Sequence, residues 1–147
     1  MTAQEFMLRY REAQQDAGRY QRRIAHLREQ ADKIAQQFGG PKASAADRAK
    51  VAEVMSALAD EERRAWEKIE QSRQVQLECA DMIDALPDAR QRTVIDALYI
   101  QGLTLEEAGR LIDRSAPVAR RAHNAALAVI DGILAERQRA GAVADDE

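Results

Sequence analysis

Apolar residues recur at alternating spacings of four and three along the N-terminal quarter of the chain. The members of this series are Phe6, Tyr10, Ala13, Ala17, Tyr20, Ile24, Leu27, Ala31, Ile34 and Phe38. This period places every member on one stripe of a helix and is typical of a coiled-coil seam. Gly39, Gly40 and Pro41 follow and supply a helix stop. We therefore predict one long helix that ends at a turn near residues 39–43.

A second helix is predicted from Ser44 to about Ala85. Ser44 and Asp47 have the spacing of a capping box, and weaker apolar periodicity follows them. Two long helices joined by a short Gly-Gly-Pro turn are expected to fold back antiparallel, so residues 1–85 should form a coiled-coil hairpin. Its proposed seam and interface residues are Phe6, Tyr10, Tyr20, Ile24, Leu27, Ile34, Phe38 and Trp66. Because a two-helix rod covers little apolar surface, we also expect a homo-oligomer.

The pattern changes to short helices after Leu86-Pro87-Asp88. Proline is tolerated only in the first turn of a helix, so a new helix should open there and run to Ile100. Gly102 should supply a left-handed turn, and Thr104 with Glu107 forms a T-x-x-E capping box for the next helix. A third helix should begin after Ser115. Three short helices at these intervals predict a helix-turn-helix domain over residues 86–137, followed by a disordered tail over 138–147.

The fold class predicted from these patterns is therefore all-α, and the composition agrees. Charged residues make up 32% of the chain and aromatic residues only 4%, as in proteins built from exposed helices. No segment has the apolar length of a signal peptide or a membrane span, so we expect a cytoplasmic protein without a membrane partner. The single cysteine, Cys79, excludes an internal disulfide and should be a reduced core thiol. The net charge of −3 means that any contact with DNA must be local.

The segment from Leu86 to Leu127 has a distinctive set of residues at fixed spacings, namely Leu86, Pro87, Gly102, Leu103, Thr104, Glu106, Glu107, Ala108, Leu111, Ser115, Ala126 and Leu127. At these positions the segment resembles region 4 of sigma-70-type factors. The whole architecture is similar to small phage and prophage proteins with an N-terminal coiled coil. Their last helix often follows a pattern that Ser115, Arg121, His123, Ala126 and Leu127 fit. This resemblance implies a late-gene transcription regulator that acts in the cytoplasm of a bacterial host. The chain departs from the family pattern at Gly109, where an alanine is usual, and at Asp113, where a turn glycine is usual.

The last short helix supplies the proposed site. A helix that enters the major groove needs donors on its first turns, and its N-terminus favours phosphate. Arg120 and Asn124 are four residues apart and share one helix face, so we assign them to base edges. The other proposed DNA contacts, mainly to phosphate, are Arg90, Arg92, Arg114, Ser115, Arg121 and His123.

No motif for catalysis, for a cofactor or for a metal is found, so an enzyme is not expected. The leading hypothesis is a DNA-binding transcription regulator or sigma-like accessory factor whose partners are double-stranded DNA and, as a further candidate, RNA polymerase. Two alternatives stay open. One is a phage DNA-packaging or assembly adaptor, and the other is a polymerase-binding module that mimics sigma region 4 without touching DNA.

Overall fold

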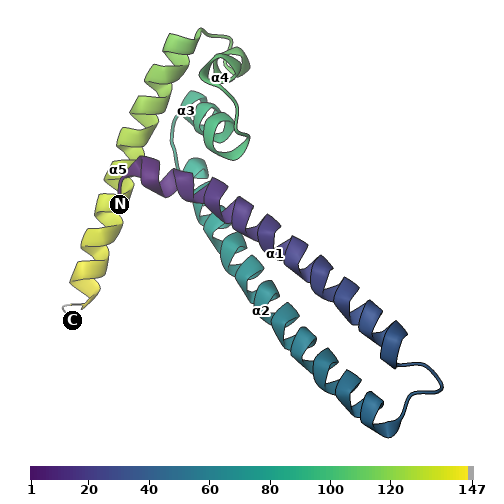
Figure 1. The fold of residues 1–147 in the computed structure, drawn as a ribbon. Helices are drawn as coiled ribbons and strands as arrows, with labels where there is room; N and C mark the ends of the chain where they lie inside the picture. The colour runs from purple at the N-terminus through teal and green to yellow at the C-terminus, as the bar shows by residue number, and fades with distance from the viewer. Residues whose placement is uncertain (146–147) are drawn as a thin grey trace. The chain divides into compact units, whose positions relative to one another are not determined.

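The computed structural model describes residues 1–145, and every regular element among them is a helix. In chain order the elements are α1 (Ala3–Phe38), α2 (Ala45–Asp84), α3 (Ala89–Ile95), the π-helix η1 (Asp96–Ile100), α4 (Leu105–Leu111) and α5 (Ala116–Asp145). Figure 1 labels the α-helices. The all-α fold class is confirmed. No helix within residues 1–145 combines the length and the apolar character that crossing a membrane requires.

The contacts divide the chain into two compact units. Unit 1 comprises Met1–Ala13 and the chain from Val75 onward, and unit 2 comprises Gln14–Gln74. Helices α1 and α2 therefore each contribute residues to both units. This division differs from the expected boundary after residue 85, because the first turns of α1 and the last turns of α2 share a buried core with the C-terminal helices.

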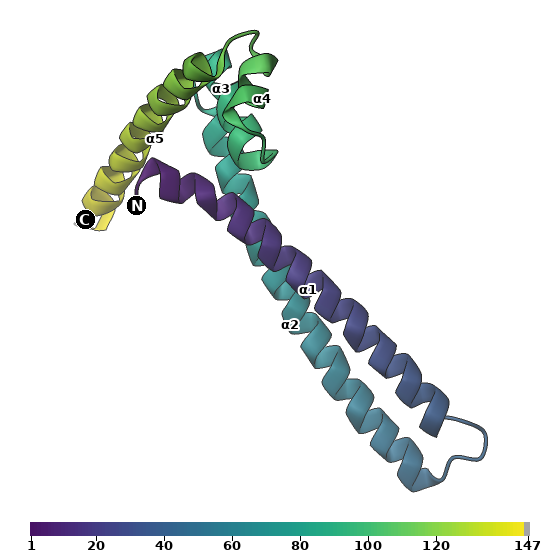
Figure 2. The same ribbon diagram turned by 45° about the horizontal axis from the view of Figure 1, so that its top comes forward.

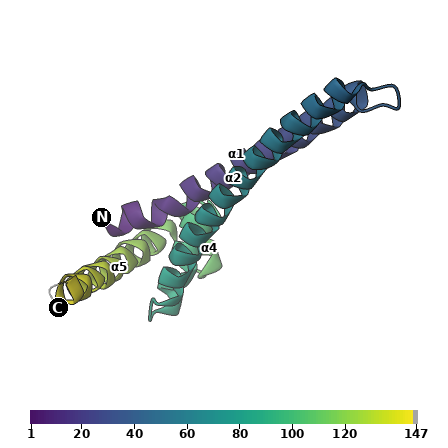
Figure 3. The ribbon, with the colours of Figure 1, turned by 90° about the horizontal axis from the view of Figure 1, so that it is seen from below.

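Unit 2 is a pair of antiparallel helices, visible in Figures 2 and 3. Its buried cluster joins Ile24 of α1 to Ala65 and Ile69 of α2. Arg28 lies one turn further along α1 and binds Glu62, one turn earlier in α2, with Nη2 2.7 Å from Oε1. Residues with increasing numbers in α1 thus contact residues with decreasing numbers in α2, as in an antiparallel pair.

The ends of these two helices follow the predicted local signals. Helix α1 ends at Phe38, immediately before the two glycines. Ser44 and Asp47 exchange the two hydrogen bonds of a capping box, with Asp47 N 3.0 Å from Ser44 Oγ and Ser44 N 3.3 Å from Asp47 Oδ2. The same exchange between Thr2 and Glu5 starts α1. Capping of this kind satisfies amide donors that have no partner inside the helix.

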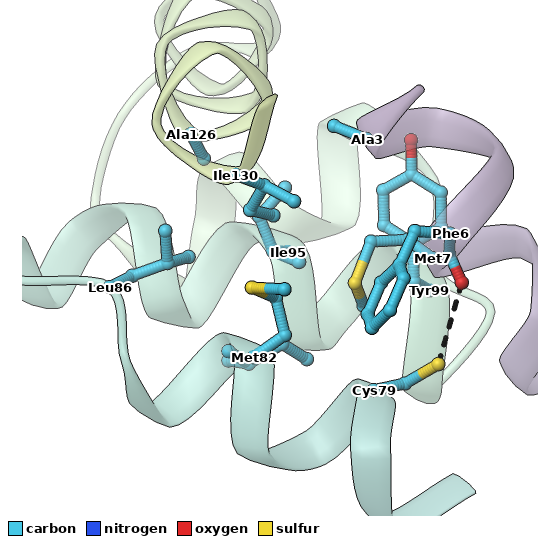
Figure 4. Packing of buried hydrophobic residues seen from close by; sticks show 11 residues of the cluster. Ala3, Phe6, Met7, Cys79, Met82, Leu86, Ile95, Tyr99, Ala126 and Ile130 are labelled. Carbon is cyan, nitrogen blue, oxygen red and sulfur yellow. Dashed lines mark hydrogen bonds between the residues drawn. The ribbon is translucent and has the colours of Figure 1, made fainter. Parts of the chain in front are cut away.

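Unit 1 has a core assembled from distant segments of the sequence. Figure 4 shows Phe6 and Met7 of α1 facing Cys79 and Met82 of α2, with Ile130 of α5 nearby. The Cys79 thiol lies 3.5 Å from the carbonyl oxygen of Phe6. Burial raises the pKa of this thiol, although the positive charge of Arg9 opposes the shift. Cys79 is thus a protonated core residue.

The proposed seam residues do not form one continuous set. Phe6 and Tyr10 pack in unit 1, whereas Ile24 and Leu27 are buried in unit 2. Tyr20 and Ile34 are partly buried. Phe38 is 50% exposed and Trp66 is 44% exposed. Phe38 is exposed because it is the last residue of α1, and the chain turns away at Gly39.

The C-terminal segment differs from the expected disordered tail. Helix α5 continues through Asp145, whereas residues 146–147 of the expected tail lie outside the described residues. Residues 138–145 contain three alanines and no proline. Alanine favours a helix, and Gly141 is not followed by a proline, so α5 is not terminated near residue 137.

Candidate nucleic-acid interface

The turn before α4 is built as the sequence predicts. Gly102 adopts the left-handed conformation, with φ of 70°. Thr104 caps α4: its side chain accepts from the Glu107 amide, and the Glu107 carboxylate accepts from the Thr104 amide in return. These contacts determine where α4 begins relative to η1.

The turn between α4 and α5 depends on Asp113 and Gly109. Asp113 has φ of 55°, so it takes the left-handed position that a glycine would otherwise occupy. Gly109 is buried against the next turn, and a Cβ atom added there would lie 2.7 Å from the carbonyl oxygen of Arg114. The Gly109 carbonyl also accepts from the Arg114 amide at 2.8 Å. Glycine at position 109 therefore permits the close approach of α4 to the start of α5.

A second small core holds the short helices together. It consists of Val94 from α3, Ala97 from η1, Ala108 from α4 and Ala119 from α5. Three of these four residues are alanines, so the backbones can approach closely. Packing through Ala119 turns one face of α5 inward, and the opposite face of its first turns is left in solvent.

The exposed face of α5 is the first part of the candidate interface. Arg120, Arg121, Asn124 and Ala125 are all exposed. From Ala116 to Ile130 the helix contains no aspartate or glutamate. Arginine and asparagine side chains are among those that commonly read base edges in the major groove.

A shallow hollow with three arginines adjoins this face. Arg90 of α3, Arg114 of the turn and Arg121 of α5 line it together with Asp88, Gln91, Val118 and Ala122. The Asp88 carboxylate is engaged in capping α3, where its Oδ1 accepts from the Gln91 amide at 2.9 Å. The structure therefore brings together three of the residues that the sequence assigns to phosphate, from two separate segments. Arginines grouped in this way suit phosphate oxygens.

Two of the proposed DNA contacts are half-buried and hydrogen-bonded to other parts of the protein. Arg92 is half-buried, and its Nη1 donates to the carbonyl oxygen of Leu86 at 2.6 Å. His123 is also half-buried, and its Nε2 lies 2.7 Å from the hydroxyl of Tyr99. The helix periodicity of α3 and α5 did not reveal these partners, because Leu86 precedes α3 and Tyr99 reaches His123 only through tertiary packing. Both side chains support the fold of the interface from within.

Ser115 lies where the sequence places it, directly before α5, and is exposed. Its carbonyl oxygen accepts from the Ala119 amide at 3.1 Å, which is the first bond of the helix. The amides at this end of a helix have no internal partners and carry partial positive charge. Because Arg114 and Arg121 lie beside the same end, the local field favours an anion.

Sequence reasoning missed Tyr99, which lies in η1. A π-helix shifts the register of the following side chains by one residue, and the residue types of the Asp96–Ile100 segment do not predict a π-helix. The Tyr99 ring stacks on His123, with 5.6 Å between ring centroids and 16° between ring planes. Burial raises the pKa of Tyr99, so its hydroxyl keeps its proton at neutral pH.

Among residues 1–145 there is no group of three or more side chains placed to hold a metal ion. Comparisons of the chain with protein-family models, with curated proteins and with solved structures gave no match.

Proposed function

We propose that this protein is a DNA-binding transcription regulator or sigma-like accessory factor that reads double-stranded DNA with α5. The main support is the exposed, acid-free face of α5 beside the hollow of Arg90, Arg114 and Arg121. In this proposal α4 and α5 act as a helix-turn-helix, Arg120 and Asn124 contact base edges, and the three arginines of the hollow contact phosphates.

The local concentration of positive charge supports DNA as the ligand of this interface. The chain carries a net charge of −3, yet the candidate interface collects four arginines, Arg90, Arg114, Arg120 and Arg121. A cation cluster in an otherwise acidic chain attracts phosphate only where it lies. Three phosphate contacts give a slope of log K against log salt of about −3 per domain. This shallow slope is itself a testable property of the proposal.

The experiment is a fluorescence-anisotropy titration on a site selected from random duplexes and on scrambled DNA. Arg120→Ala should cost about 1 to 3 kcal/mol on the selected site and relax the preference at one base position. Arg121→Ala and Arg114→Ala should weaken binding to both duplexes similarly and make the salt slope shallower by about 1 each. Arg137→Ala is the matched control, because Arg137 is exposed on the same helix but outside the interface.

The same titration separates the alternatives. If the three interface variants bind like wild type and like Arg137→Ala, α5 does not read DNA, and a polymerase-binding module becomes the better proposal. Pull-down of purified RNA polymerase by the wild-type protein then tests that module directly. Tight binding without any base preference would favour a packaging or assembly adaptor.

We further propose that α1 and α2 of unit 2 pack as a coiled coil and support a homo-oligomer. The narrow cluster of Ile24, Ala65 and Ile69 and the exposed rings of Phe38 and Trp66 support this proposal. A second copy would cover these rings and bury further apolar surface. Sedimentation equilibrium should detect a dimer or larger species, and a strict monomer at all concentrations would contradict it.

A further inference from the structure

A chain of three side chains runs from the core of unit 1 to the exposed face of α5. The Tyr99 hydroxyl lies 2.7 Å from His123 Nε2, and His123 Nδ1 lies 3.1 Å from Asn124 Oδ1. Tyr99 is only 8% exposed, whereas Asn124 is exposed. The hydroxyl of a buried tyrosine is therefore linked through one imidazole to a side chain of the proposed reading face.

The direction of the hydrogen bonds follows from the groups at the two ends. Asn124 Oδ1 can only accept, so His123 Nδ1 must carry a hydrogen. A neutral imidazole with Nδ1–H has an unprotonated Nε2, which accepts the hydrogen of the Tyr99 hydroxyl. The three residues thus form one consistent relay, from Tyr99 O–H to His123 to the carbonyl oxygen of Asn124.

The relay determines which group Asn124 offers to a ligand. Its Oδ1 is turned toward His123 Nδ1, so its amino group, on the other side of the amide, is the group turned away from His123 and left to donate. Guanine presents only acceptors, N7 and O6, on this part of the major-groove edge. Adenine presents an acceptor and a donor, and an asparagine binds both only when its amide oxygen faces the base together with its amino group.

We propose that Tyr99 and His123 are positioning residues that hold the amide of Asn124 as a donor and make it select guanine over adenine. This inference rests on the proposed function, because it requires α5 to lie in the major groove. Without the Tyr99 hydroxyl, the imidazole hydrogen of His123 can move from Nδ1 to Nε2, its usual position in a free imidazole. Nδ1 then becomes an acceptor, the amide turns over to donate to it, and Oδ1 faces the DNA.

The test compares Tyr99→Phe with Tyr10→Phe in the full chain. Both variants lose one hydroxyl from a tyrosine of unit 1, but only Tyr99 is bonded to His123. Binding is measured by competition on the selected duplex and on its single-base replacements. Asn124→Ala identifies the base position that Asn124 reads. At that position Tyr99→Phe should shift the preference from guanine toward adenine by about tenfold, whereas Tyr10→Phe should leave it unchanged.

Nitrogen-15 NMR of the imidazole side chains tests the relay without DNA. The chain has two histidines, and His26 is exposed and serves as the internal reference. In the wild type, His123 should carry its hydrogen on Nδ1, and in Tyr99→Phe it should carry it on Nε2. A general loss of stability would not produce this exchange of hydrogen position, so the readout separates positioning from a merely structural role.

The outcomes are distinguishable. Wild-type His123 protonated on Nε2 would overturn the relay whatever the DNA results are. In a second outcome, the NMR result is as expected and the protein binds DNA, but Tyr99→Phe and Tyr10→Phe show the same base preference. This outcome would overturn the positioning role but leave the proposed function intact. The expected NMR result without any binding of DNA by the wild type would overturn the proposed function, and the selection of guanine with it.

Discussion

The two units are both helical, but they bury their side chains in different ways. In unit 2 the buried cluster consists of Ile24, Ala65 and Ile69 from two helices. In unit 1 the main cluster draws residues from α1, α2, α3, η1 and α5. A helix with one neighbour hides one narrow face from water, whereas a helix with several neighbours buries residues on more than one face. The number of packing partners, and not the helix itself, decides how many residues become core.

This difference affects how far each unit can be understood from local sequence. The two helices of unit 2 meet along one stripe, so their register follows from periodicity and from one turn. The helices of unit 1 meet through residues that are distant in sequence, such as Met7 of α1, Met82 of α2 and Ile130 of α5. Unit 1 is therefore expected to be more sensitive to single substitutions than unit 2.

The largest effect is expected from Met7→Ala. Met7 is 0% exposed in the core of unit 1, so its truncation should cost about 2 to 5 kcal/mol of unfolding free energy. The measurement is urea unfolding followed by far-ultraviolet circular dichroism. The chain has a single tryptophan, Trp66, which lies in unit 2, and its fluorescence should respond less.

Leu8→Ala is the control for that substitution, because Leu8 is the next residue and is 49% exposed. Its cost should be within about 0.5 kcal/mol of zero. Equal effects of the two substitutions would mean that the first turns of α1 do not belong to the core of unit 1, and the comparison between the units would fail.

An intermediate effect is expected from Gly109→Ala. The added Cβ atom would lie 2.7 Å from the Arg114 oxygen and 3.1 Å from the Ser115 oxygen, both of which are backbone atoms. The turn must move, at a cost of about 1 to 3 kcal/mol. Thermal unfolding measures the stability, and the anisotropy titration measures the loss of DNA affinity that a displaced α5 should cause.

Gly132→Ala is the matched control in α5, since nothing lies within 4 Å of a Cβ added there. In a helix interior this change should stabilise by about 0.5 to 1 kcal/mol. If Gly109→Ala also stabilises the protein, the close approach of α4 to the start of α5 is not required.

The smallest effect is expected in the pH dependence of the stability of unit 2. The hydrogen bonds from Arg28 hold the pKa of Glu62 below its usual value of 4.5, and desolvation only partly opposes them. A carboxyl group whose pKa is lower in the folded than in the unfolded state stabilises the folded state. This contribution is complete above the pKa of the unfolded state and is lost as the pH falls through the pKa of the folded state. Stability read by Trp66 fluorescence should therefore decline slightly below about pH 4.5, and this part of the decline should be absent in Glu62→Gln.

Glu61→Gln is the control for this measurement, because Glu61 is exposed next to Glu62 and is not paired with Arg28. It should retain the decline of the wild type. An unchanged acid response in Glu62→Gln would mean that the contact between Arg28 and Glu62 does not stabilise the helix pair.

Much of the candidate interface could be predicted from local signals. The Thr104 capping box, the left-handed Gly102 and the start of α5 after Ser115 each depend on residues only a few positions apart. The exposure of Arg120 and Asn124 also follows from helix periodicity once the start of α5 is known. The roles of Arg92 and His123 could not be predicted, because their partners Leu86 and Tyr99 lie outside their own helical turns.

The sequence by itself determined the helical class, the turns at Gly39 and Gly102, and the caps at Ser44 and Thr104. Propensity, capping and left-handed turns are interactions between near neighbours, and so they can be read from local sequence. Only the tertiary structure decided that Met7 is core while Leu8 is exposed, that Arg90 joins Arg114 and Arg121, and that Tyr99 reaches His123. Such pairings depend on the direction in which whole helices pack, and that direction is set by the sum of many weak contacts across the chain.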